Sequence, residues 1–165
     1  MGKTIRINGL SEATIDAAAK ELRRYAEWVE SKEAELITRL AERGKDVASV
    51  KFASAVYDGT NDVSVRVDNA GSVAVIYAEG SAVAFIEFGS GAAMGYGHPQ
   101  AGEHGFGPGT WSTGESGKGH WDDPDGWYYK HGEKSHGNPP AMAMYDAVQT
   151  MTAEITTIAR EVFGS

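Results

Sequence analysis

The sequence contains no cysteine at any of its 165 positions. This absence excludes a disulfide framework, cysteine-ligated zinc, an iron–sulfur cluster and thiol catalysis. Basic residues are also few, because 15 lysines and arginines face 23 aspartates and glutamates, and the formal net charge is -8. A wide nucleic-acid-binding surface needs many cations to neutralise phosphates. The composition therefore argues against a protein that grips DNA or RNA.

Long apolar segments are missing as well. No run approaches the roughly 20 apolar residues that span a bilayer, and the first residues lack the apolar block of a secretory signal peptide. We therefore expect a soluble protein with no membrane partner that does not use the general secretory route. Hydrophobic residues make up 41% of the chain and charged residues 23%. These values are ordinary for a globular protein and predict a single domain over residues 1–165.

Residues 1–10 precede the first periodic pattern. Ile5 and Ile7 alternate with polar neighbours, which is typical of a short strand or a docking arm. Gly9 then interrupts the alternation. We expect an N-terminal arm over these ten residues.

A long helix is predicted from Ser11 to about Arg43. Its apolar residues recur at three- and four-residue steps, as expected of one helix face. They are Ile15, Ala18, Leu22, Tyr25, Val29, Leu36 and Leu40. Ser11 suits the N-cap, and Gly44 suits a left-handed residue that closes the helix. Charged residues that interrupt the apolar stripe predict a bend or a break near Ser31.

The period then changes from helical spacing to two-residue alternation. Residues 50–57, 62–68 and 72–78 are rich in valine, isoleucine and tyrosine, and turn-forming residues separate them. They predict three antiparallel strands in a meander. Residues 81–88 suit either a short helix or a fourth strand, and we favour a helix that ends at Gly89.

Residues 89–140 differ in composition from the rest of the chain. They hold 14 of the 21 glycines, all five prolines, all five histidines and three of the four tryptophans. Long loops without regular structure are usually functional or disordered, but disordered segments contain few aromatic residues. Trp111, Trp121 and Trp127 therefore predict a long loop insert that orders against its own domain or against a neighbouring subunit.

A second helix is predicted over about residues 140–163, with Pro140 in its first turn. Its apolar stripe begins at Met144 and continues at helical spacing to Val162. We expect this helix to pack on the sheet. The predicted fold class is α+β, with a long N-terminal helix, a small mostly antiparallel sheet, a long glycine- and aromatic-rich insert and a C-terminal helix.

One carboxylate stands alone among apolar residues. Glu87 has Phe85, Ile86 and Phe88 as neighbours. A carboxylate that is buried needs a charge partner or hydrogen-bond donors. We interpret Glu87 as a structural residue that is paired or caps another element, rather than as a catalytic acid or base.

The insert also suggests two other functions. His120, His131 or His136, with an aspartate from residues 122–125, would suit a metal-dependent hydrolase that activates water on zinc. No pair of these histidines has the four-residue spacing of a helical zinc motif. The tryptophans of the insert would suit stacking on sugar rings, although sugar-binding modules are usually all-β.

Four segments occur in an order that points to one protein family. Residues 83–91 contain an apolar pair followed by Glu-Phe-Gly, and residues 7–10 open the first helix with Ile-Asn-Gly-Leu. Residues 57–65 match a first hairpin, and residues 137–147 form a proline- and methionine-containing entry into the last helix. Together they resemble the neck or tail-completion proteins of long-tailed bacteriophages. Many members also carry a Pro-x-x-Thr-Gly-x-Leu segment before the sheet, which residues 46–50 lack.

The resemblance implies a structural virion protein, with no enzymatic activity and no cofactor or metal. Such a subunit assembles with itself into a ring of six or twelve copies at the head–tail junction, beside other connector, head-closure and tail proteins. DNA passes through the lumen without sequence-specific binding, and an acidic subunit suits that passage because it repels phosphates. The expected location is the virion neck and, during assembly, the host cytoplasm. The candidate assembly and structural residues are Glu87, Phe88, Gly89, Trp111, Trp121, Trp127, Pro140 and Met144.

Overall fold

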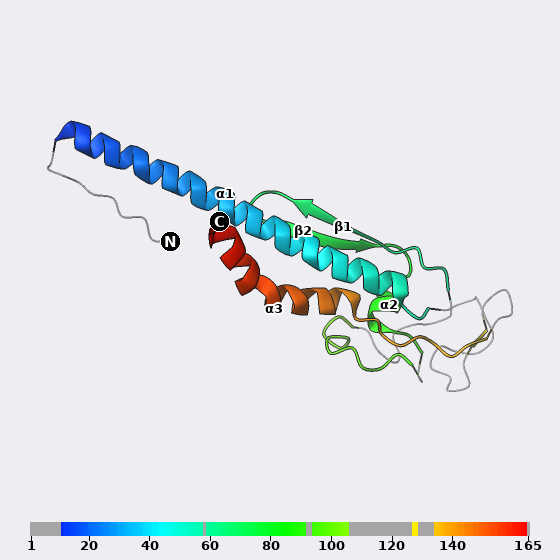
Figure 1. The fold of residues 1–165 in the computed structure, drawn as a ribbon. Helices are drawn as coiled ribbons and strands as arrows, with labels where there is room; N and C mark the ends of the chain where they lie inside the picture. Colours follow the sequence, from blue (N-terminus) through cyan, green and yellow to red (C-terminus); the bar gives the residue numbers. More distant parts are fainter. Residues whose placement is uncertain (1–10, 58, 92–93, 106–126, 129–133, 165) are drawn as a thin grey trace.

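The computed structural model describes residues 11–57, 59–91, 94–105, 127–128 and 134–164. Its elements follow the expected α+β order (Figure 1). They are α1 (Glu12–Ser54), β1 (Ser64–Asn69), β2 (Ala74–Glu79), α2 (Val83–Phe88), β3 (Trp127–Tyr128), β4 (Lys134–Ser135) and α3 (Ala143–Gly164). The predicted N-terminal arm lies outside the described residues, as does most of the insert.

Helix α1 begins where the sequence predicts and ends later. Ser11 caps it, because the Ser11 hydroxyl accepts from the Thr14 N–H at 3.4 Å while the Thr14 hydroxyl accepts from the Ser11 N–H at 3.1 Å. The helix then runs without interruption to Ser54, so the predicted end at Arg43 is wrong and α1 has no break near Ser31. The first part of the predicted strand over residues 50–57 is instead the last turn of α1.

Gly44 explains the wrong boundary. It lies inside α1, where a Cβ atom would come within 2.6 Å of Ile76 Cδ1 and 2.7 Å of Met151 Sδ. The glycine therefore allows β2 and α3 to approach the helix closely, and it does not close the helix. Buried Ala41 and Ala48 extend the same line of small residues along α1.

Strands β1 and β2 form an antiparallel hairpin in which Asn69 pairs with Ala74 at the turn and Ser64 pairs with Glu79 at the open end, and β3 and β4 form a second, shorter antiparallel pair. The predicted meander of three strands is wrong, because residues 50–54 belong to α1. A two-stranded hairpin needs a packing surface to be stable. Here α1 provides that surface (Figure 1).

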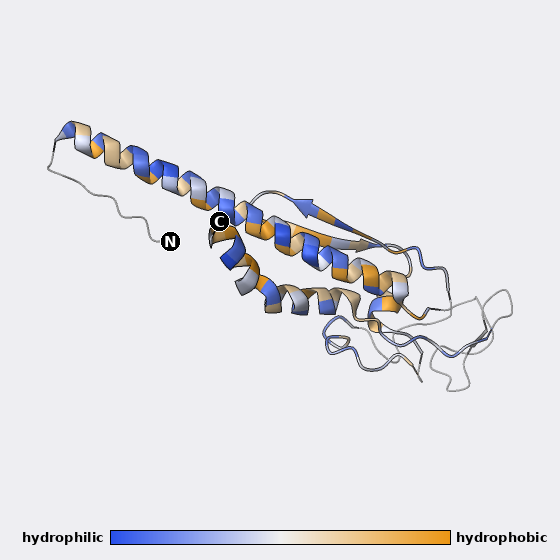
Figure 2. Cartoon of the chain, in the orientation of Figure 1, coloured by the Kyte–Doolittle hydropathy of each residue, from blue (hydrophilic) through white to orange (hydrophobic). Residues whose placement is uncertain are grey.

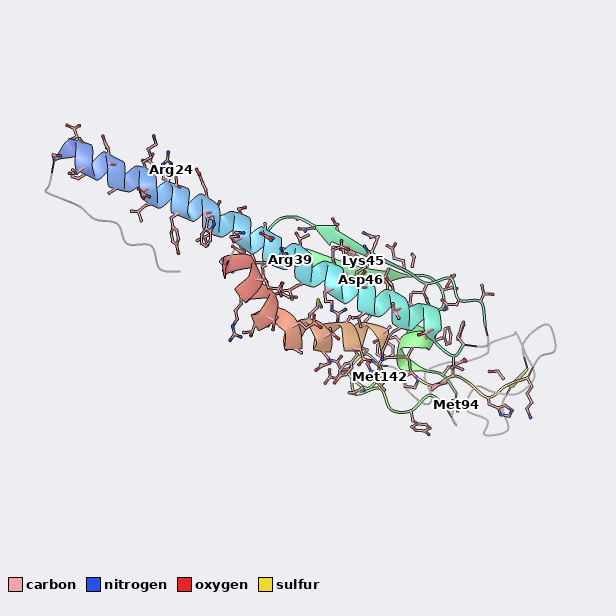
Figure 3. All side chains as sticks on the ribbon, in the orientation of Figure 1. Arg24, Arg39, Lys45, Asp46, Met94 and Met142 are labelled. Atoms are coloured by element: carbon pink, nitrogen blue, oxygen red, sulfur yellow. The ribbon has the colours of Figure 1, made fainter. Side chains whose placement is uncertain are left out.

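Helix α3 runs antiparallel to α1 and makes its main contact with that helix, where we expected the sheet. Arg43 donates to both carboxylate oxygens of Glu154, at 2.8 and 2.9 Å. This pairing raises the pKa of Arg43 and lowers the pKa of Glu154. Lys51 pairs with Asp146 nearer the start of α3. Arg39, labelled in Figure 3, pairs with a carboxylate in the last turns of α3, so ion pairs follow the whole contact.

The core is small and lies toward one end of the molecule. Its main cluster joins the C-terminal half of α1, helix α2 and the start of α3. The cluster consists of Ala48, Phe52, Ala82, Ile86, Ala143 and Ala147. No residue of α1 before Ala41 is buried. Figure 2 shows the apolar residues of α1 concentrated beside the hairpin and α3, and a more hydrophilic outer half.

The N-terminal part of α1 extends beyond the rest of the described chain (Figure 1). Trp28 meets Phe163 of α3 edge to face at 6.0 Å, and this contact marks where α3 ends against α1. We call the part of α1 before Trp28 the overhang. In the described segments, no helix has the length and apolar content needed to cross a membrane.

Candidate assembly site around Glu87

Helix α2 is fixed at its start by Asp62, which precedes β1. The Asp62 carboxylate accepts from the Ser81 and Ala82 N–H groups at 2.8 and 3.0 Å and from the Ser81 hydroxyl at 2.7 Å. These bonds, led by that from the Ser81 backbone, lower the pKa of Asp62 to about 2. At the other end, Gly89 closes α2 with a φ of 76°, as the sequence predicts. The hairpin and α2 are thus joined through one carboxylate.

Glu87 is the centre of the site. Its side chain is buried and points to the start of α3, where its two oxygens accept from the Met144 N–H at 2.8 Å and the Tyr145 N–H at 3.0 Å. The first N–H groups of a helix have no partner within the helix, and a carboxylate at that end is stabilised by the helix dipole. Glu87 therefore caps α3 from another element. The expectation that this residue is paired or caps a helix is confirmed.

His98 completes the environment of the Glu87 carboxylate. Its Nε2 lies 3.2 Å from Glu87 Oε1, and its Nδ1 accepts from the Gln100 N–H at 3.1 Å. Because Nδ1 accepts, the proton of a neutral imidazole is on Nε2, which donates to Glu87. The buried carboxylate thus joins α2, the start of α3 and the loop around His98.

Aromatic rings surround this polar centre. The Phe88 ring lies 4.5 Å from the His98 ring at a tilt of 60°, and the His104 ring lies 5.7 Å from Phe88. Tyr145 meets His98 edge to face at 5.6 Å. The apolar faces of these rings reduce the access of water to the Glu87 bonds and strengthen them.

The segment that leads into α3 crosses the end of α2, and we call residues 137–142 the strap. Ser90 and Asn138 exchange backbone hydrogen bonds of 2.9 and 3.1 Å. The Ala141 N–H donates to the Ile86 carbonyl at 2.8 Å, and the Met142 N–H donates to the Glu87 carbonyl at 3.3 Å. The strap therefore satisfies the last carbonyls of α2, which have no partner within that helix.

Two glycines make this close approach possible. A Cβ on Gly89 would come within 2.8 Å of the Asn138 carbonyl oxygen and of the Pro140 nitrogen. A Cβ on Gly137, which has a φ of 90°, would come within 2.0 Å of the Ser90 carbonyl oxygen. Only glycine fits at these positions, because both the backbone conformation and the available space exclude a side chain.

The predicted start of the last helix at Pro140 is wrong. Pro140 belongs to the strap, and α3 begins at Ala143. Met142, labelled in Figure 3 near the start of α3, has a φ of 53°, and its carbonyl accepts the first helical bond, from the Asp146 N–H at 2.9 Å. The Ala141 and Met142 N–H groups before that point bond to carbonyls of α2, so the chain becomes helical only after the strap.

Five of the eight candidate residues meet at this junction: Glu87, Phe88, Gly89, Pro140 and Met144. Trp111 and Trp121 lie outside the described residues. Trp127 lies in β3, where it pairs with Ser135 of β4, and its side chain is not among those described.

Four further residues of the site were not predicted from the sequence: His98, Gly137, Asn138 and Tyr145. Gly137 follows a histidine in a glycine-rich stretch, and nothing in its local sequence distinguishes it from the glycines around it. His98 lies 11 residues after Glu87 in a loop, so no local pattern links the two side chains. The partners of Asn138 and Tyr145 are far away in sequence.

The Glu87 site is a structural hydrogen-bond network that holds α2, the start of α3 and the loop around His98 together. Both carboxylate oxygens and both ring nitrogens of His98 have hydrogen-bond partners. In the described part of the chain, no three histidine, aspartate or glutamate side chains gather closely enough to hold a metal ion. His120 and His131, two of the three histidines of the alternative hydrolase, lie outside the described residues.

A second feature is an apolar groove between α1, β2 and α3. Its volume is about 500 Å³, and α1, β2 and α3 line it with residues that include Leu40, Val75 and Val148. Val73 at its rim is 58% exposed and Val148 is 51% exposed. On the overhang, Ile15 and Leu22 are 52% and 56% exposed. The monomer thus leaves two apolar surfaces in contact with water.

Comparison of the chain with protein-family models, with curated proteins and with solved structures found no match.

Proposed function

We propose that this chain is a structural subunit of the head–tail connector of a long-tailed bacteriophage, a neck or tail-completion protein. Copies of it form a ring of six or twelve subunits, and DNA passes through the lumen without sequence-specific contacts. The observation that carries the proposal is the pair of apolar surfaces that the monomer leaves exposed, on the overhang and along the groove. Exposed apolar surface of this kind marks sites of protein–protein contact.

The groove and the N-terminal end of the chain, from which the overhang projects, are unlike surfaces, which favours a ring in which the N-terminal end of one copy meets the groove of the next. The overhang is a projecting helix, and the groove is a concave surface between three elements. Contacts between unlike surfaces of identical subunits are head to tail, and such contacts close into rings when the rotation between subunits permits. A symmetric dimer would need one surface that is complementary to itself.

The Glu87 site supports the same function. Its hydrogen bonds fix α2, α3 and the strap relative to one another, and the bonding groups are used within the chain. A fixed frame of this kind suits a subunit that must present its surfaces in constant geometry. A catalytic carboxylate would instead need an oxygen that a substrate can reach.

Charge and location complete the proposal. The formal net charge of -8 gives a ring lumen that repels phosphates, which suits DNA passage. The partners are further copies of the chain and the connector, head-closure and tail proteins above and below the ring. The protein acts in the virion neck, after assembly in the host cytoplasm.

Electron microscopy of the purified, tag-free chain at high concentration tests the proposal. We expect closed rings of six or twelve subunits in the wild type. A Val148→Asp variant should lose them, because the aspartate places a charge in the apolar groove. A Gln149→Asp variant is the matched control, since Gln149 is the next residue, is exposed and does not line the groove. Wild-type protein that stays monomeric, or that hydrolyses a substrate with a zinc ion bound to the insert histidines, would contradict the proposal.

A further inference from the structure

The outer edge of β2 is unpaired within the described chain. β2 bonds to β1 along one side, and no other strand pairs with it. In an antiparallel pair, alternate residues direct their N–H and C=O groups away from the partner strand, so these groups of β2 face the groove. Edge strands are usually protected by lysine, proline or a bulge. The sequence of β2, Ala-Val-Ile-Tyr-Ala-Glu, contains neither lysine nor proline.

The groove beside this edge has the form of a site for an added strand. β2 provides the free backbone edge, and Leu40 of α1 and Val148 of α3 provide apolar walls. Strand addition of this kind uses main-chain bonds for affinity and pockets for alternate side chains for specificity. The occupant should therefore be an extended segment with apolar residues at alternate positions.

We infer that residues 4–8 of one copy add as a strand to the free edge of β2 in a neighbouring copy and place Ile5 and Ile7 in its groove. This segment, Thr-Ile-Arg-Ile-Asn, has apolar residues at two alternate positions. The inference rests on the proposed ring and names the contact that builds it.

Chain length requires the contact to be between copies. The described chain starts at Ser11, at the tip of the overhang, and the nearest residue of α1 that lines the groove is Ile37. The helix between them is about 37 Å long at roughly 1.5 Å per residue. An extended chain covers at most about 3.6 Å per residue, so Ile7 reaches about 14 Å from Ser11 and Ile5 about 21 Å. Neither can reach the groove of its own chain.

Charge also favours this occupant. Residues 1–10 contain Lys3 and Arg6 and no acidic residue. The formal net charge of the whole chain is -8, so the rest of the chain is more negative than this by two charges. On an added strand, Arg6 would face away from the two isoleucines, toward the outer face of the sheet. Asp68 lies on that face, directly opposite Val75 of β2. A basic arm is complementary to an acidic body.

Disulfide cross-linking tests the contact, and the absence of native cysteine makes single-cysteine variants specific. Ile7→Cys protein is mixed with Val148→Cys protein in the full-length chain and oxidised. A disulfide needs Cα atoms within about 7 Å of each other. We expect a cross-linked species of twice the monomer mass. Ile7→Cys mixed with Gln149→Cys should give little of it, because Gln149 is on the same helix outside the groove.

Three results would overturn the inference. The first is equal cross-linking with Gln149→Cys. The second is an internal disulfide within a monomer of the double variant Ile7→Cys/Val148→Cys. The third is cross-linking of Val148→Cys to Leu22→Cys in place of Ile7→Cys, which would mean that the overhang fills the groove.

An assembly variant separates this inference from the proposed function. Ile5→Asp/Ile7→Asp should lose the assembled species with no change in melting temperature, and Ile5→Val/Ile7→Val should keep it. Rings that persist in the aspartate variant would support the connector function and overturn the arm contact. Specific cross-linking through Ile7 in open filaments without rings would support the arm contact and contradict the connector function.

Discussion

Replacement of Glu87 by glutamine changes the capping of α3 with almost no change in side-chain volume. The carboxylate has two oxygens that accept from the Met144 and Tyr145 N–H groups, and one of them also accepts from His98. The amide keeps one oxygen and replaces the other by an NH₂ group, which cannot accept. At least one buried N–H then loses its acceptor. An unsatisfied buried group costs about 1–3 kcal/mol, so we expect Glu87→Gln to lower the free energy of unfolding by about 2 kcal/mol.

Denaturant unfolding and calorimetry measure this loss. For a chain of this length, about 2 kcal/mol corresponds to a fall in melting temperature of roughly 4–8 °C. Amide exchange should also accelerate at Met144 and Tyr145. Glu33→Gln is the matched control, because Glu33 is an exposed residue of α1 and surface substitutions usually stay within about 0.5 kcal/mol. A Glu87→Gln protein as stable as this control would refute the capping role.

Three other substitutions test further parts of the structure. The folded pKa of Asp62 is lowered to about 2, so its stabilising contribution is complete above the unfolded value of about 4 and is lost as the pH falls toward 2. An Asp62→Asn variant should therefore show a smaller drop in melting temperature between pH 5 and pH 2 than the wild type, and an equal drop would contradict the capping of α2. Gly137→Ala should cost about 3 kcal/mol or more, because its Cβ would meet the Ser90 carbonyl; Gly71→Ala, which has a similar φ and open space, should cost only about 1–2 kcal/mol in denaturant unfolding. Replacing residues 106–126 by a short Gly–Ser linker should leave the melting temperature nearly unchanged and abolish assembly in sedimentation velocity, whereas normal assembly would show that the aromatic insert is not an assembly element.

The sequence predicted the ends of elements correctly where residues close in sequence determine those ends. Ser11 caps α1 through Thr14, three residues away, and Gly89 ends α2 through its own positive φ of 76°. The hairpin follows from valine alternation and its turn residues, and its strands are displaced by only one or two positions. Glu87 could be assigned a capping or paired role because an isolated carboxylate in an apolar segment has few other uses.

Contacts between residues distant in the sequence determine the features that could not be predicted from it. A glycine after an amphipathic run usually closes a helix, but Gly44 is placed to admit Ile76 and Met151 against α1. Residues 50–54 contain valine and phenylalanine, which suit a strand, yet Phe52 completes the helical core face with Ala48. The partners of Glu87 lie 11, 57 and 58 residues away, so no local pattern identifies them.

The native mass spectrum of the purified, tag-free chain tests the central claim, that this chain is a ring-forming structural subunit. The monomer mass is 17.6 kDa. We expect a dominant species whose mass corresponds to six or twelve copies and includes no metal, as a closed head-to-tail ring requires. A monomer or dimer that carries one tightly bound zinc ion per chain would contradict the claim and would favour a zinc site at the histidines of the insert.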